Sequence, residues 1–301
     1  MIQRQYQHPQ DIKLLQEFNS LAISETDGCG YLQPGDIPHH VFNGNKHFDP
    51  SEILTIWEDD SGVVAWVLVG PRMKLFDVQV RPGLRSMDLE STVLTFAYDS
   101  LIQQMQYHNI DGDKVFCDSF QCDTIRSTSL LKLGWKLESQ GEYVLNYADL
   151  VDLVEPELPV GYKIRSSDGV HEAESLAEIH SKSFGTTWTK ELYQKVMESP
   201  GYSPEREFVV IAPNGAFAAF MVIWYDYKNK SGYFEPVGVH ENYRRLGLGR
   251  SLILSGLIQM RNIGMSKAIV ANFTSNNAAS TLYKSCGFNP KYYLDYYSKS
   301  I

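Results

Sequence analysis

A short segment rich in arginine and glycine carries the clearest chemistry in this sequence. Residues 244–249 read Arg-Arg-Leu-Gly-Leu-Gly, and a third arginine, Arg250, follows them. Glycines let backbone N–H groups close around an anion, and the first turn of a helix adds its dipole to such a pocket. Arginine side chains supply the positive charge that phosphate oxygens prefer. The segment therefore predicts a binding site for a pyrophosphate group.

The elements around this segment are the ones that such a site needs. Residues 233–239 form an apolar, strand-like stretch before it. Apolar residues recur at helical spacing from Leu252 to Met260, and Gly264 provides a stop for that helix. We therefore expect a strand, a phosphate-binding loop and a helix, in that order.

Three types of phosphate-binding loop compete for this segment. A Walker loop ends in Gly-Lys-Ser/Thr, which does not follow Gly249, and a Rossmann loop requires a third glycine where Leu252 stands. The segment resembles the Arg/Gln-x-x-Gly-x-Gly/Ala loop of the GNAT acetyltransferases at every position. For this motif taken by itself, a glycine-rich turn that only caps a helix is the alternative.

A second segment strengthens the resemblance. Residues 276–288 contain Asn277, a run of small residues, Tyr283 and then Gly287-Phe288, which is similar to the second GNAT signature. In that family, the small residues let the helix lie close to the pantetheine arm of the cofactor. Asn277 can be the N-cap of this helix or a hydrogen-bond partner of the arm.

The resemblance also implies an order of elements for the second half. From residue 162 onwards, we expect a strand, two helices, three strands, the phosphate loop with its helix, a strand, a helix and the final strands. A Pro-Asn-Gly turn at residues 213–215 joins two of these strands. Residues 292–297 would form part of a closing hairpin in this half.

The first half repeats this plan in a weaker form, which indicates an internal duplication. Residues 124–135 align without gaps on residues 277–288, and Gly134-Trp135 take the place of the later Gly-Phe pair. The whole chain thus resembles tandem GNAT proteins of the mycothiol synthase type. This resemblance implies an α/β (α+β) fold of two tandem GNAT-like domains, each with a mixed, mostly antiparallel central sheet flanked by helices.

An acidic, proline-bearing stretch at residues 152–159 is typical of a linker. We therefore expect an N-terminal, degenerate GNAT-like domain at residues 1–152. The catalytic GNAT domain, which would bind acetyl-CoA, is expected at residues 153–301.

The two halves differ where the cofactor would bind. Residues 81–90 lack the Gly-x-Gly pair, and Asp88 and Glu90 would repel a pyrophosphate. Leu130 stands where the second half has Tyr283. Residues 1–154 carry a net charge of −11, against +2 for the rest of the chain. An acidic half holds acetyl-CoA poorly; it can attract a cationic amine, or it is simply a solvated surface.

Acetyl transfer to an amine requires a base and an acid. The resemblance places the acid at Tyr283, although a half-buried tyrosine that anchors the helix also fits. Glu235 is the candidate base, because a carboxylate in an apolar strand is costly to bury unless it is used or paired. A glutamate that is salt-bridged or orients the substrate is the alternative. Strand alternation would place four residues on one face, namely Tyr233, Glu235, Val237 and Val239. His240 is expected to be a loop residue.

The resemblance assigns the remaining residues mostly to the acetyl-CoA site. Phe184 and Trp188 lie in a segment that lines the acceptor pocket in this family, or they belong to the core. The residues expected to contact the cofactor are Val237, Val239, Arg244, Arg245, Gly247, Leu248, Gly249, Arg250 and Asn277.

Length and composition set the remaining expectations. A chain of 301 residues is long enough for two domains, and its four cysteines form no Cys-x-x-Cys pair. We expect free structural thiols, no metal site and, without an apolar run of bilayer length or a signal peptide, a cytoplasmic location. The expected partner is a small-molecule amine, without nucleic acid or membrane, and the protein would be a monomer or homodimer. A non-catalytic acyl-CoA sensor or regulatory module is the alternative function.

Overall fold

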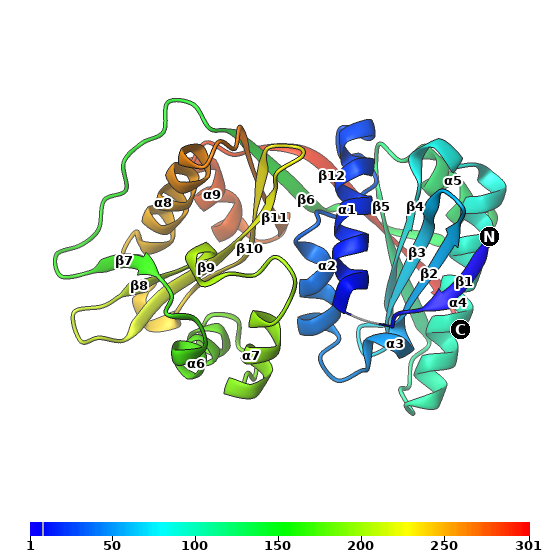
Figure 1. The fold of residues 1–301 in the computed structure, drawn as a ribbon, viewed down its shortest axis with the longest axis horizontal. Coiled ribbons are helices and arrows are strands. Elements are labelled where there is room, and N and C mark those ends of the chain that lie inside the picture. The colour runs from blue at the N-terminus through cyan, green and yellow to red at the C-terminus, as the bar shows by residue number, and fades with distance from the viewer. Residues whose placement is uncertain (8) are drawn as a thin grey trace. The chain divides into compact units, whose positions relative to one another are not determined.

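The computed structural model describes residues 1–7 and 9–301, which form two compact units (Figure 1). Unit 1 comprises residues 1–144, 273–275 and 292–301, and unit 2 comprises residues 145–272 and 276–291. Strand β6 (Lys136–Asp149) runs from unit 1 into unit 2, whereas β12 (Asn289–Ser300) runs from unit 2 into unit 1.

Unit 1 is a twisted sheet with helices packed on it. Its strands lie in the order β1-β2-β3-β4-β5-β12, and every neighbouring pair is antiparallel except β4 and β5, which are parallel. The strands are β1 (Ile2–Gln5), β2 (Leu54–Asp59), β3 (Gly62–Gly70), β4 (Leu75–Val80) and β5 (Lys114–Phe120). The helices are α1 (Pro9–Thr26), α2 (Asp36–Pro38), η1 (His39–Gly44), α3 (Pro50–Ile53), η2 (Pro82–Leu84), α4 (Met87–Tyr107) and α5 (Thr124–Lys132).

Unit 2 has the order of elements that the sequence predicts from residue 162 onwards. Its strands lie in the order β6-β11-β10-β9-β8-β7; β7 to β10 pair antiparallel, and β10 and β11 are parallel. The strands that follow β6 are β7 (Lys163–Ser166), β8 (Glu207–Ile211), β9 (Phe217–Asp226), β10 (Ser231–Val239) and β11 (Lys267–Phe273). The helices are η3 (Gly169–Glu172), α6 (Ala173–Phe184), α7 (Lys190–Met197), η4 (Pro204–Arg206), η5 (Glu241–Tyr243), α8 (Leu248–Asn262) and α9 (Asn277–Ser285).

Each unit has its own hydrophobic core. The core of unit 1 includes the fully buried Trp66 and Phe76. In unit 2, strand alternation sends Phe220 of β9 into a cluster with α6 and α7, and the adjacent Met221 into a cluster with α8. The two sides of this sheet are thus covered by different helices, which holds β10 between α6 and α8.

The division into units differs from the domain division expected at residues 152 and 153. Along the chain, the division falls within β6, between Val144 and Leu145. Residues 292–301, assigned to the second half by sequence, belong to unit 1. The reason is strand pairing, because β12 lies antiparallel to β5 from Leu294 opposite Phe120 to the C-terminal end of the strand.

The cysteines also differ from expectation. Cys29 and Cys122, expected to be free thiols, form a disulfide within unit 1, with Cα atoms 6.2 Å apart. Their separation of 93 residues hides this pairing in the sequence. Cys117 and Cys286 are free and buried, as expected of structural thiols.

Candidate active site

The parallel strands β10 and β11 separate in the middle of unit 2. They are paired only from Ser231 to Phe234, which lie opposite Lys267 to Val270. Beyond this point, β10 continues to Val239 alongside β9 alone. The edge of β10 that faces away from β9 is therefore open over its last five residues.

Two residues turn their backbone groups towards this opening. The N–H of His240 donates to the carbonyl of Ala218 on β9 at 3.0 Å, and Gly238 lies opposite Phe220. Because backbone groups alternate between the two edges of a strand, Gly238 pairs with β9, whereas Val237 and Val239 face the opening. These two residues can thus offer amide groups to an extended ligand.

The side chains of β10 do not alternate as the sequence predicts. The register with β9 shifts between Phe234 and Val237, at a bulge that contains Glu235. Phe234 and Val237 both pack on the α8 side, so Tyr233 lies on the opposite face from Val237. The expectation of one shared face is wrong, because a bulge reverses the alternation.

The predicted phosphate loop lies between β10 and α8. Arg245 and Gly247 both have left-handed backbone conformations, with φ angles of 66° and 77°. Gly247 is the N-cap of α8 and has no side chain to cap it, and a Cβ atom there would meet nothing within 4 Å. The first N–H groups of a helix have no acceptor inside the helix. The loop thus leaves open space beside unused donors and the positive end of a helix dipole.

Gly249 has a different role from Gly247. A Cβ atom at Gly249 would lie 3.3 Å from both Leu282 of α9 and Val239 of β10. The missing side chain lets α8 begin close against both elements. The loop is thereby brought to the end of the opening that starts at Phe234.

The arginines of the loop are placed differently from one another. The guanidinium of Arg244 donates to the backbone carbonyl of Ser183, at the end of α6, at 3.0 Å, and its Nε contacts the carbonyl of Val239. Arg245 is exposed, and Arg250 lies half-buried in the first turn of α8. Arg244 therefore fastens the loop to its surroundings, while Arg245 and Arg250 provide positive charge around the helix start.

Tyr283 and Glu235 are electrostatically coupled. Tyr283 is only 8% exposed and lies on α9 beside Cys286 and Phe288. Burial raises the pKa of the Tyr283 hydroxyl well above its usual value, and the nearby Glu235 carboxylate raises it further. At neutral pH, Tyr283 is therefore a neutral hydrogen-bond donor.

The start of α9 corrects one detail of the sequence interpretation. The side chain of Asn276, not of Asn277, is the N-cap, because its oxygen accepts from the N–H of Ala279 at 3.1 Å. Asn277 is the first residue of the helix and is exposed. Of the two roles predicted for Asn277, only the contact with a bound ligand stays a prediction.

A buried polar network beside the opening was not predicted from the sequence. Asn272 of β11 accepts from the amide of Asn146 on β6 at 2.9 Å and donates to the hydroxyl of Ser280 on α9 at 3.0 Å. The network links β11 and α9 where β11 no longer pairs with β10. The available signal was a single asparagine near the end of an otherwise apolar strand, followed by a helix.

The aromatic residues near α6 separate into two groups. Trp188 is buried in a cluster with Tyr193 and Phe220, which supports the core interpretation for it. Phe184 is 46% exposed at the end of α6 and can line an adjoining surface. His240 accepts from the N–H of Asn242 and caps η5, which is the loop role expected for it.

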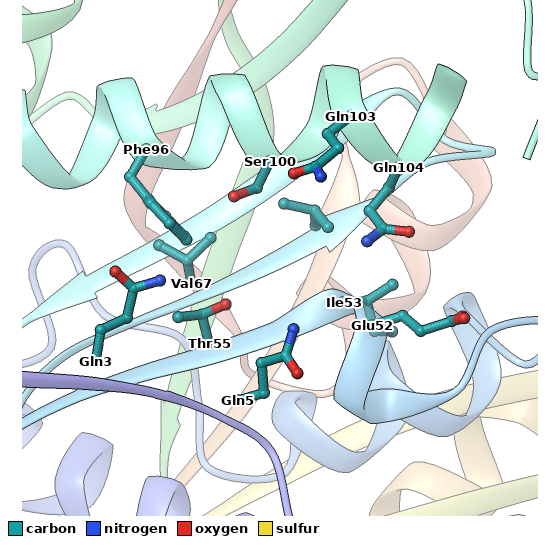
Figure 2. Close-up of a pocket in the computed structure, with 11 residues that line it drawn as sticks. Gln3, Gln5, Glu52, Ile53, Thr55, Val67, Phe96, Ser100, Gln103 and Gln104 are labelled. Atoms are coloured by element: carbon teal, nitrogen blue, oxygen red, sulfur yellow. The ribbon is translucent and has the colours of Figure 1, made fainter. Parts of the chain in front are cut away.

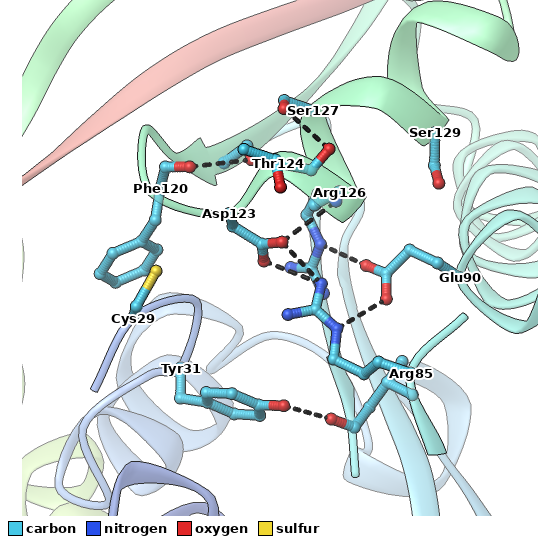
Figure 3. Close-up of polar contacts among 12 residues, drawn as sticks. Cys29, Tyr31, Arg85, Glu90, Phe120, Asp123, Thr124, Arg126, Ser127 and Ser129 are labelled. Atoms are coloured by element: carbon cyan, nitrogen blue, oxygen red, sulfur yellow. Dashed lines mark hydrogen bonds and ion pairs between the residues drawn. The ribbon is translucent and has the colours of Figure 1, made fainter. Parts of the chain in front are cut away.

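In unit 1, salt bridges fill the region at the starts of α4 and α5, which corresponds to the region around the phosphate loop of unit 2 (Figure 3). Glu90, on α4, is completely buried between Arg85, at 3.1 Å, and Arg126, at 2.7 Å. Arg85 also pairs with Asp123, the N-cap of α5, at 2.8 Å. Burial alone would raise the pKa of Glu90, but the two arginines outweigh it and hold the pKa below its usual value.

This network changes the reason why unit 1 lacks a phosphate site. Glu90, expected to repel a phosphate from a loop, is enclosed in the protein instead. Side chains also cap both helices, since Ser86 accepts from the first turn of α4 and Asp123 accepts from the first turn of α5. Each cap satisfies one of the first N–H donors of its helix, and the buried ion pairs of Arg85 with Glu90 and Asp123 add negative charge beside these helix starts.

The parallel strands β4 and β5 of unit 1 also separate, and a carboxylate follows the last paired residue on each strand. Strands β4 and β5 pair only at Leu75–Phe116 and Phe76–Cys117, and Asp77 and Asp118 come next. Burial, followed by the charge of Asp77, raises the pKa of Asp118 to about 7, and His40 partly offsets this. Asp77 thus holds the place in unit 1 that Glu235 holds in unit 2.

Comparisons with known proteins agree with this geometry. Residues 173–288 match the model of the acetyltransferase (GNAT) family. A mycothiol acetyltransferase from Thermobispora bispora is 28% identical over 145 residues, which is 44% of this chain and 48% of that protein. The match therefore spans about half the length of this relative. These similarities support an acyltransferase enzyme of the GNAT type.

Solved structures support the fold of the whole chain. A GCN5-related N-acetyltransferase from Sphaerobacter thermophilus has a TM-score of 0.65 at 17% identity, covering 99% of this chain and 95% of that one. A tandem GNAT protein from the clavulanic acid biosynthesis pathway also has a TM-score of 0.65, at 14% identity, covering 99% and 98%. At these identities the likeness concerns the fold alone, and it confirms the expected GNAT-like architecture.

Two further features of the described residues concern membranes and metal ions. Within residues 1–7 and 9–301, no helix is long and apolar enough to span a bilayer. The same residues contain no cluster of three or more His, Cys, Asp or Glu side chains arranged to hold a metal ion.

Proposed function

Because residues 173–288 match the model of the GNAT acetyltransferase family, we propose that unit 2 transfers an acetyl group from acetyl-CoA to the primary amine of a small molecule. The observation that carries the proposal is the opening between β10 and β11, which leads directly to the uncapped start of α8. Tyr283 and Glu235, a coupled acid and carboxylate, lie beside this opening.

The residues around the opening would contact the pantetheine arm and the pyrophosphate of acetyl-CoA. Val237 and Val239 would pair their backbone amides with the pantetheine arm. The pyrophosphate would occupy the open space beside Gly247, where the helix start and two arginines favour negative charge. The small residues at the start of α9 leave room for the arm between β10 and β11.

In the proposed reaction, the amine attacks the thioester carbonyl directly, within a complex of enzyme and both substrates. The new bond joins the amine nitrogen to the acetyl carbon, and the bond from that carbon to sulfur breaks. Glu235 accepts the proton that the amine loses, and Tyr283 gives its proton to the departing thiolate. A final proton transfer from Glu235 to Tyr283 restores the enzyme.

The coupling between the two residues suits this sequence of steps. An ionised Glu235 keeps Tyr283 protonated until the reaction starts. Once Glu235 has taken the amine proton, its negative charge is gone and no longer opposes ionisation of Tyr283. The phenol thus becomes a better acid at the moment when the thiolate needs a proton.

The proposal is tested by measuring thiol release from acetyl-CoA with a panel of small primary amines. We expect slow release without amine and faster release with one chemical class of amine. Measured affinity for acetyl-CoA without accelerated release across the panel would favour the alternative, a non-catalytic acyl-CoA sensor or regulatory module.

We also propose a cytoplasmic location and action as a monomer or homodimer, without nucleic acid or membrane partners. The location follows from the donor, which is an intracellular metabolite. Disulfides are rare in a reducing cytoplasm, so the Cys29–Cys122 bond is the observation that challenges it. Rapid alkylation of cells tests the location: Cys29 and Cys122 recovered as thiols would support the cytoplasm, and a stable disulfide in the cellular protein would contradict it.

A further inference from the structure

Unit 1 contains a pocket away from the strand opening (Figure 2). The pocket has a volume of about 160 Å³ and lies between the edge strands β1 to β3 and the helices α3 and α4. It exists because α4 packs over β3 and β4, which leaves the edge of the sheet partly uncovered on this side.

Side chains line this pocket in register. Gln5 of β1 lies opposite Thr55 of β2, which in turn lies opposite Val67 of β3, so the three share one face of the sheet. From α4, Ser100 and Gln104 are four residues apart and therefore point to the same side of the helix. The pocket is a regular consequence of the fold and not an irregular gap.

The lining combines an apolar floor with amide walls (Figure 2). Val67, Val69 and Ile53 contribute the floor, and four glutamines contribute carboxamides, which both donate and accept hydrogen bonds. No Lys or Arg occurs among the described residues that line it. Arg4, which lies between two of these glutamines in sequence, points to the other face and pairs with Asp11 and Glu58.

Gln104 shows that the pocket is chemically incomplete. Its Oε1 is buried and accepts no hydrogen bond from the described residues. Leaving a buried acceptor without a donor is unfavourable. The one carboxylate of the lining, Glu52, lies 3.6 Å from the Nε2 atom of His108 and also caps α3. A ligand that brings hydroxyl groups would satisfy the amides without adding charge.

We propose that this pocket binds a small, uncharged polyhydroxyl molecule of the size of a monosaccharide. The volume is well below the roughly 300–1,000 Å³ of sites for drug-sized ligands. Hydroxyl groups match carboxamides because each group donates and accepts, and the apolar floor suits the C–H face of a sugar ring. The site is separate from the acetyl transfer proposed for unit 2.

The test is a binding titration of the full chain, in which NMR detects binding of each probe. The probes are glucose, mannose, ribose and myo-inositol, with spermidine and citrate as charged comparisons. We expect saturable binding of at least one uncharged probe. Gln104→Leu should weaken it by about tenfold or more, the effect of losing one buried hydrogen bond.

A matched control lies on the same helix, because Gln106 is exposed and outside the pocket. Gln106→Leu should leave the affinity unchanged. Ser100→Leu, which fills the pocket, provides a second variant should Gln104→Leu fold poorly. The proposal is overturned if no uncharged probe binds saturably, if only spermidine or citrate binds, or if binding survives both pocket variants.

Discussion

Tyr283 and Glu235 are the residues on which the proposed chemistry depends. The surrounding fold holds both residues in place. The ring of Tyr283 packs against Phe288. Glu235 lies in the bulge of β10, and its backbone carbonyl accepts a hydrogen bond from the indole N–H of Trp224 at 2.7 Å. Burial and the nearby Glu235 carboxylate raise the pKa of Tyr283, and strongly shifted pKa values cluster at functional sites. The proposed acid role of Tyr283 fits this pattern.

Replacement of Tyr283 by phenylalanine tests this role. We expect turnover to fall by about tenfold or more, the usual effect of losing an acid–base group, with acetyl-CoA affinity nearly unchanged. Tyr225→Phe is the control, since the Tyr225 hydroxyl is buried without a hydrogen-bond partner among the described residues. Steady-state kinetics and a binding titration would measure both effects; unchanged turnover would remove Tyr283 from the mechanism.

Glu207 gives a second prediction at this scale. It is completely buried, and burial raises its pKa to about 7 although Tyr193, Tyr202 and Ser167 donate hydrogen bonds to it. The folded protein therefore binds this proton more tightly than the unfolded chain. The contribution of Glu207 to stability should be fully present below its unfolded pKa of about 4.3 and should be lost as the pH rises through about 7, by on the order of 3 kcal/mol.

Urea unfolding between pH 5 and pH 8 measures this dependence. Glu207→Gln should reduce the slope, whereas Glu205→Gln, at an exposed neighbour, should not. Part of the slope should remain, because the pKa of Asp118 in unit 1 is also raised to about 7. An equal slope in the Glu207→Gln protein would show that Glu207 does not titrate in this range.

At the scale of elements, helix α8 and the loop before it form the proposed anion site. The two ends of α8 carry comparable glycines, Gly247 at the start and Gly264 after the end, with φ angles of 77° and 88°. A Cβ atom at either position would meet nothing within 4 Å. Only the start of the helix, however, has free N–H donors and a positive dipole end.

This symmetry provides a matched pair of variants. Gly247→Glu should weaken acetyl-CoA binding by about a hundredfold or more, because the carboxylate would occupy the anion space with a like charge. Gly264→Glu imposes similar backbone strain at the other end and should keep the affinity. Calorimetric titration distinguishes the two; equal affinity in both variants would refute the loop assignment.

The elements also show how far the sequence could be interpreted. The phosphate loop, both signature helices and the order of strands follow from glycine placement and apolar spacing. The bulge at Glu235 could not be predicted, because one inserted residue leaves no periodic signal and still reverses the faces of the strand. The cap at Asn276 was missed because two adjacent asparagines are equivalent in sequence.

At the scale of the molecule, the two units have similar orders of strands and helices but differ in the side chains beside their parallel strands. Unit 2 leaves an opening beside an uncapped helix, whereas unit 1 fills the matching region with Arg85, Glu90, Asp123 and Arg126. The sequence revealed the missing glycines of unit 1. The salt bridges and the Cys29–Cys122 pairing depend on contacts between distant residues, which no local pattern records.

This difference predicts the stoichiometry of cofactor binding. We expect one acetyl-CoA per chain, bound by unit 2, because capping side chains and buried ion pairs with Glu90 and Asp123 occupy the matching region of unit 1. Isothermal titration of the full chain should give a single site, and Gly247→Glu should remove it. Two sites per chain, or one site that survives Gly247→Glu, would place the cofactor in unit 1.

The central claim is direct acetyl transfer to an amine in unit 2. Its most direct test uses acetyl-CoA with a ¹³C-labelled acetyl group and the amine that accelerates thiol release, analysed by mass spectrometry in a single turnover. The account predicts labelled N-acetylated amine and free coenzyme A in equal amounts, with neither formed rapidly by Tyr283→Phe. Label recovered as free acetate or attached to the protein, with the amine unmodified, would contradict it.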